Sequence, residues 1–138
     1  MLKKQMYTVS IVDEKIKKLY DAAKAAVNPK KISEQMCSGG VGAAVITKKG
    51  NIYKGVCIDT DCSLGMCAER NAISTMITNG EFEIEMVAAV DKSGKVLPPC
   101  GACREFMLQL RNSSDIKVLV DDKGTVIMLR DLVPYSYS

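Results

Sequence analysis

The chain has 138 residues and a formal net charge of +3, with 47% hydrophobic and 25% charged residues. This length and composition fit one globular domain with an apolar core, so we expect a single domain over residues 1–138. Lysines and arginines are scattered among acids, and the aromatic residues are two phenylalanines and five tyrosines, which argues against a nucleic-acid-binding surface.

The N-terminal third of the chain predicts a helix and then a loop. Ser10 and Asp13 form a capping box, apolar residues follow at helical spacing, and Asn28 with the next proline ends the pattern. Residues 30–39 are polar and end in glycines, so we expect a loop there. No apolar run reaches the length of a signal peptide or of a bilayer span, which predicts a cytoplasmic protein without a membrane partner.

Short apolar runs separated by turn residues predict the strands of one sheet. The expected strands are residues 41–47, 52–58, 86–90, 116–120 and 125–128. A second helix is expected to begin at Cys67 and to end at Asn79, and a third to follow Cys100. The predicted buried face of the second helix comprises Ala68, Ala72, Ile73, Met76 and Ile77. This element order indicates an α/β fold with a mixed, five-stranded sheet between helices, a three-layer α/β/α domain.

Two of the predicted helix starts carry three thiols and one carboxylate. Cys67 and Glu69 lie two residues apart at the first, and a Cys-x-x-Cys pair, Cys100 and Cys103, opens the second. Helix N-termini favour thiolates over thiols. Because the chain has no histidine, a transition-metal site must use sulfur and carboxylate ligands, and three sulfurs with an open fourth position can hold catalytic Zn²⁺. Glu69 would then carry protons and would not bind the metal.

Three thiolates on Zn²⁺ leave a net charge of −1, so a neighbouring cation is expected to offset it. Arg70 directly follows the Cys67-Ala68-Glu69 triplet and Arg104 directly follows Cys103, so either guanidinium could donate hydrogen bonds to the sulfurs as an outer layer of the metal site. An alternative is a closed structural zinc site in which Cys62 supplies a fourth sulfur. The Cys-x-Glu half argues against it, because a structural site has no need of a carboxylate beside the metal.

The two motifs, Cys-Ala-Glu-Arg-Asn-Ala at 67–72 and Pro-Cys-Gly-Ala-Cys-Arg-Glu at 99–105, resemble those of the cytidine deaminase superfamily, small three-cysteine type. The resemblance covers residues 41–110. It implies zinc on Cys67, Cys100 and Cys103, and a homotetramer as in most relatives. It further implies that Glu69 takes a proton from the water activated by zinc and passes it to the ring nitrogen and the leaving amine.

The resemblance is weaker where these enzymes hold the nucleoside. Gly39 stands where they carry a phenylalanine, and Cys57 and Asp59 stand in place of their asparagine and glutamate for the ribose. By resemblance, the backbone amide of Ala68 or Cys67 would help to bind the ring carbonyl. Tyr137 would reach a neighbouring subunit's site, with Tyr135 as the alternative.

The expected activity is zinc-dependent deamination of cytidine or deoxycytidine in pyrimidine salvage. One alternative is deamination of a modified cytosine nucleoside, because the chain is also similar to blasticidin S deaminase. The other is a zinc-stabilised protein without catalysis.

Overall fold

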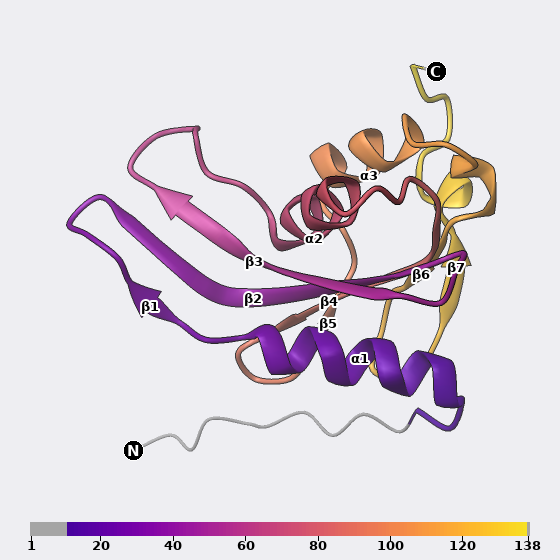
Figure 1. The fold of residues 1–138 in the computed structure, drawn as a ribbon, viewed down its shortest axis with the longest axis horizontal. Coiled ribbons are helices and arrows are strands. Elements are labelled where there is room, and N and C mark those ends of the chain that lie inside the picture. The colour runs from indigo at the N-terminus through magenta and orange to yellow at the C-terminus, as the bar shows by residue number, and fades with distance from the viewer. Residues whose placement is uncertain (1–10, 138) are drawn as a thin grey trace.

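The computed structural model describes residues 11–137, which form a mixed β-sheet between two helical layers (Figure 1). The helices are α1 (Glu14–Ala26), α2 (Ala68–Thr78) and α3 (Gly101–Leu108), with two short 3₁₀ turns, η1 (Ser113–Asp115) and η2 (Leu129–Leu132). The strands are β1 (Lys30–Lys31), β2 (Met36–Thr47), β3 (Ile52–Thr60), β4 (Ile84–Asp91), β5 (Val96–Leu97), β6 (Lys117–Leu119) and β7 (Val126–Met128). No helix within residues 11–137 is long and apolar enough to cross a membrane.

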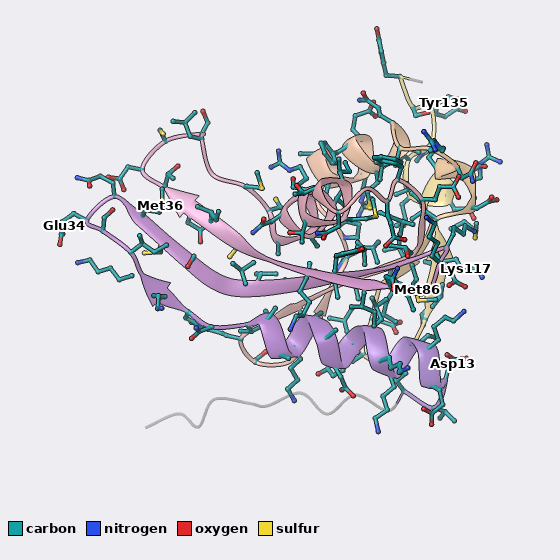
Figure 2. The ribbon with its side chains drawn as sticks, viewed as in Figure 1. Asp13, Glu34, Met36, Met86, Lys117 and Tyr135 are labelled. Atoms are coloured by element: carbon teal, nitrogen blue, oxygen red, sulfur yellow. The ribbon has the colours of Figure 1, made fainter. Side chains whose placement is uncertain are left out.

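The sheet contains all five expected strands in the order β3-β2-β4-β6-β7, and β4 with β6 is a parallel pair among antiparallel ones. It has seven strands because two-residue strands, β1 and β5, add to β2 and β4. The expected loop at 30–39 is therefore wrong in part. Lys30 and Lys31 pair with Ser38 and Cys37, and β2 begins at Met36, so the polar sequence there is an exposed hairpin (Figure 2).

Helix α1 covers one face of the sheet and α2 with α3 cover the other (Figure 1). Asp13 caps α1 by accepting hydrogen bonds from the backbone N–H groups of Lys15 and Ile16. Ser10, the other half of the expected capping box, lies outside the described residues. Leu19 and Ala23 of α1 are fully buried against the sheet, as the helical spacing predicts.

Helix α2 lies unusually close to β3, and this contact fixes the position of the N-terminus of α2 relative to the sheet. A Cβ added to Gly55 would lie 2.3 Å from the backbone nitrogen of Ala72, so only glycine allows this approach. The side-chain amide of Asn71 also donates a hydrogen bond to the backbone carbonyl of Val56, at 3.0 Å. The buried stripe of α2 is narrower than expected: Ala72, Ile73 and Met76 are buried, whereas Ile77 in the last turn is 39% exposed.

Candidate active site

The three predicted thiols meet where the first turns of α2 and α3 come together. Cys67 and Cys100 immediately precede the two helices, and Cys103 lies one turn into α3, fully buried. Their Sγ atoms all lie within 4.8 Å of one another, and Cys67 and Cys100 are 3.4 Å apart. Cys62 is exposed and does not belong to this group, so residues 11–137 contain no four-sulfur cage.

The donor set and its surroundings fit Zn²⁺. A tetrahedral zinc with Zn–S bonds of about 2.3 Å places its sulfurs about 3.8 Å apart, which agrees with the spacing of the thiols. Arg70 approaches them with Nη2 3.8 Å from the Cys67 sulfur. Its Nε is buried without a hydrogen-bond partner among the described atoms. A cationic donor beside three sulfurs suits a metal site that carries excess negative charge.

The surroundings of the three thiols shift their pKa values in different directions. Burial raises the pKa of Cys103, and the nearby Glu69 carboxylate raises it further. Burial, followed by the hydrogen bond with Cys100, also raises the pKa of Cys67. Burial works against ionisation of Cys100 as well, but the backbone N–H groups of Cys103 and Ala102 help to lower its pKa. Three thiolates this close would repel one another, and a divalent metal ion offsets that repulsion.

Glu69 is a buried carboxyl group on the first turn of α2, only 6% exposed. Burial raises its pKa, although its own backbone N–H and the charge of Arg70 oppose the shift. A raised pKa brings a carboxyl group closer to the working pH, which favours the exchange of protons that a general acid–base group performs.

A cavity of about 660 Å³ opens in front of Glu69 and the thiols. Its walls come from β2, β3, the loop before α2 and the end of β4. Among the residues expected to bind the substrate, Cys57, Asp59 and Ala68 line it. The volume is in the range of small-molecule sites.

Three expected residues lie elsewhere. Arg104 does not donate to a sulfur: its Nε donates to the Pro99 carbonyl at 2.8 Å and its Nη1 to the Leu132 carbonyl at 3.1 Å. It follows the buried Cys103 in α3, so the turn of the helix directs it away from the thiols. Tyr137 is 97% exposed and does not line the cavity of its own chain, so its reach into a neighbouring subunit's site stays a prediction. Tyr135 also projects outward, near the end of the chain (Figure 2).

Gly39 also lies outside the cavity and leaves no space for an aromatic ring. Its φ is +84°, and a Cβ there would lie 2.0 Å from the carbonyl oxygen of Asn28. The wall at this end of β2 is formed instead by Gly40 and Val41. The ring-stacking position of the resembling enzymes is therefore absent at Gly39.

Asp91 and Lys92 line the cavity, and the sequence carries no prediction for them beyond a strand that ends at residue 90. Asp91 is brought there by the pairing of β4 with β2, opposite Val41. Its Oδ1 accepts hydrogen bonds from the Ser93 N–H and hydroxyl and from the Lys95 N–H. The available signal was a charged pair directly after a buried strand, which is a common place for functional residues.

Comparisons with known proteins agree with this geometry. Residues 13–120 match the family model described as the cytidine and deoxycytidylate deaminase zinc-binding region. The chain is 32% identical over 109 residues to blasticidin-S deaminase of Bacillus cereus, and 33% identical over 103 residues to a cytidine deaminase of Halalkalibacterium halodurans. Each match covers 71% of this chain and 76% of the relative.

Solved structures resemble the whole described fold. The crystal structure of cytidine deaminase from Mycobacterium tuberculosis has a TM-score of 0.76 and 25% identity, covering 91% of this chain and 99% of that one. The enzyme from Mycobacterium leprae gives a TM-score of 0.73 and 29% identity, covering 88% and 99%.

Proposed function

Because the chain belongs to the cytidine and deoxycytidylate deaminase family, we propose that it is a zinc-dependent hydrolase that converts a cytosine nucleoside to the uracil nucleoside and ammonia. The observation that carries the proposal is the position of Glu69, a buried carboxyl group beside three clustered thiols at the wall of a nucleoside-sized cavity.

In this proposal Cys67, Cys100 and Cys103 hold the ion. When bound, zinc supplies Lewis acidity that lets a water molecule act as a nucleophile near neutral pH. Arg70 donates toward the Cys67 sulfur and partly offsets the negative charge of the thiolates.

In this proposal Glu69 transfers protons from the attacking water to the substrate. It accepts one from the attacking water and delivers it to the ring nitrogen, so that the amine-bearing ring carbon becomes tetrahedral. It then takes the proton from the hydroxyl group on the tetrahedral carbon and delivers it to the exocyclic amine, so that the C–N bond breaks and ammonia leaves while the ring carbonyl forms. The raised pKa of Glu69 and its place at the cavity wall support this role. The backbone amide of Ala68, at the same wall, is suited to donate to the ring carbonyl.

A modified cytosine nucleoside is the second candidate substrate. The observation in its favour is the similarity to blasticidin-S deaminase of Bacillus cereus, together with Cys57 and Asp59 on the wall where the resemblance implies an asparagine and a glutamate. A non-catalytic zinc protein is disfavoured, because a structural site gives no reason to bury Glu69 beside the cavity.

We also propose that the chain assembles as a homotetramer. The family resemblance supports this assembly. In the assembly, Tyr137 would approach the cavity of a neighbouring subunit. Sedimentation at micromolar concentration tests the proposal, and a monomer would contradict it.

Ammonia release by the zinc-loaded protein tests the activity. The substrates are cytidine, deoxycytidine, blasticidin S and free cytosine. Turnover of cytidine or deoxycytidine supports the first candidate, and turnover of blasticidin S alone supports the second. A protein that holds one zinc per chain and releases no ammonia from any of the four would contradict the proposed activity.

A further inference from the structure

The pairing of β2 with β3 is interrupted at the cavity wall. Ser38 pairs with Ile58 and Gly42 pairs with Val56, so residues 39–41 of β2 stand opposite Cys57 alone. Such a bulge disturbs the ladder of backbone hydrogen bonds. Within it, the backbone N–H of Val41 donates to the Sγ of Cys57 at 3.2 Å.

The same thiol also contacts the next cavity residue on β3. Cys57 Sγ donates to Oδ2 of Asp59 at 3.7 Å. A thiol is a weak donor and a weak acceptor, and here both capacities are used within the protein. Although Cys57 lines the cavity, it is 9% exposed, and it has little capacity left for a substrate hydroxyl.

Asp59 is placed differently. It is exposed and lines the cavity, and the contact with Cys57 engages only one of its two oxygens. A carboxylate accepts hydrogen bonds at both oxygens, so Oδ1 is available for hydroxyl donors. An exposed side chain that is held in one orientation loses less conformational entropy when it binds a ligand.

We propose that Cys57 is a positioning residue: its thiol ties the β2 bulge to Asp59, so that Asp59 presents an oriented carboxylate to the sugar hydroxyls of the substrate. This inference rests on the proposed function for the identity of the substrate. It assigns Cys57 no direct contact with the substrate.

Three substitutions at Cys57 separate hydrogen bonding from packing. Cys57→Val fills the site without a donor or acceptor, and Cys57→Ala removes the volume as well. Cys57→Ser keeps a hydrogen-bond donor and an acceptor in a smaller group. Gly40 leaves space beside residue 57, since a Cβ added to Gly40 would lie 4.0 Å from the Cys57 sulfur. Serine should therefore rescue what valine loses.

The kinetic test compares cytidine with 2′,3′-dideoxycytidine, which lacks the hydroxyls. Cys57→Val should raise KM for cytidine about tenfold, the effect of one hydrogen bond to a charged group, with a much smaller change in kcat. KM for the dideoxy substrate should stay within about twofold, and Cys57→Ser should resemble the wild type. When Cys57→Val is added to the Asp59→Asn variant, KM for cytidine should rise little further, because the two residues act as a unit.

Equal losses on both substrates, or additive losses in the double variant, would overturn the proposal in favour of simple packing. Hydrogen exchange at the Val41 amide gives a readout that does not need activity: it should speed up in Cys57→Ala and stay slow in Cys57→Ser. Unchanged exchange in Cys57→Ala would also overturn the proposal. A wild type that deaminates no nucleoside would contradict the proposed function, while the Val41 amide would still test the tie between Cys57 and the bulge.

Discussion

Replacing Gly55 by alanine should test how the sheet positions α2, the helix that carries Glu69. The new Cβ would lie 2.3 Å from the Ala72 nitrogen and 2.9 Å from the Ala68 carbonyl oxygen. Both are backbone atoms of α2, so no side-chain rotation can relieve the contact. Because ordinary contacts begin near 3.4 Å, α2 must move away from β3 by roughly 1 Å.

The movement should affect both stability and catalysis. Overpacking of this kind costs about 1–3 kcal/mol of unfolding free energy. Helix α2 carries Glu69 and follows Cys67 directly, so the shift also displaces the proposed acid–base group. A misplacement of about 1 Å can lower the rate about 10²-fold. We expect Gly55→Ala to show both losses, measured by urea unfolding and by kcat/KM for the substrate found in the ammonia screen.

Gly101→Ala is the matched control for stability. It is the same chemical change at the first residue of α3, where an added Cβ meets no atom within 4 Å. It should be neutral, or stabilising by up to about 1 kcal/mol because alanine is the better helix former. A Gly55→Ala protein with wild-type stability and kcat/KM would refute the reasoning that this close contact sets the position of α2.

Two further substitutions test charge near the site and a polar cluster away from it. Arg70→Ala should keep the fold but raise the zinc dissociation constant about 10- to 100-fold, because the guanidinium donates toward the Cys67 sulfur. Competition with a fluorescent chelator measures this, and an Arg70→Ala protein with wild-type affinity would contradict it. The hydrogen bond from Tyr53 lowers the pKa of Glu81, so its stabilising effect is full above the ordinary glutamate pKa of about 4.3 and is lost as pH falls through the lower folded value. Tyr53→Phe should therefore be less stable than the wild type at pH 7, and the difference in urea midpoint should shrink as the pH falls below about 4.3. A difference that stays constant with pH would contradict this.

The places of the three thiols at helix starts could be predicted from sequence because these determinants are local. Cys67 and Cys100 each precede a helix, and the Cys-x-x-Cys spacing brings Cys103 onto the first turn beside Cys100. Because the chain has no histidine, metal sites with imidazole ligands are excluded. The five main strands also follow from apolar runs between turn residues, which need no knowledge of distant contacts.

The cavity walls could not be predicted in the same way because they depend on strand register. The bulge opposite Cys57 and the pairing of Val41 with Asp91 join residues far apart in sequence. A residue that is next to a thiol in sequence need not contact that thiol in the structure. Arg104 follows Cys103, yet the helix turns its side chain toward the Pro99 and Leu132 carbonyls. Each of these positions is fixed by tertiary contacts and not by a local pattern.

The most direct test of the proposed chemistry is the turnover of Glu69→Gln at equal zinc content. The amide is nearly isosteric with the carboxyl group but cannot carry the proton, so the variant should bind one zinc per chain and lose about 10²- to 10⁴-fold in kcat. Zinc content by elemental analysis and ammonia release are measured on the same preparation. A zinc-loaded Glu69→Gln protein that deaminates cytidine at the wild-type rate would contradict the role of Glu69 and with it the proposed mechanism.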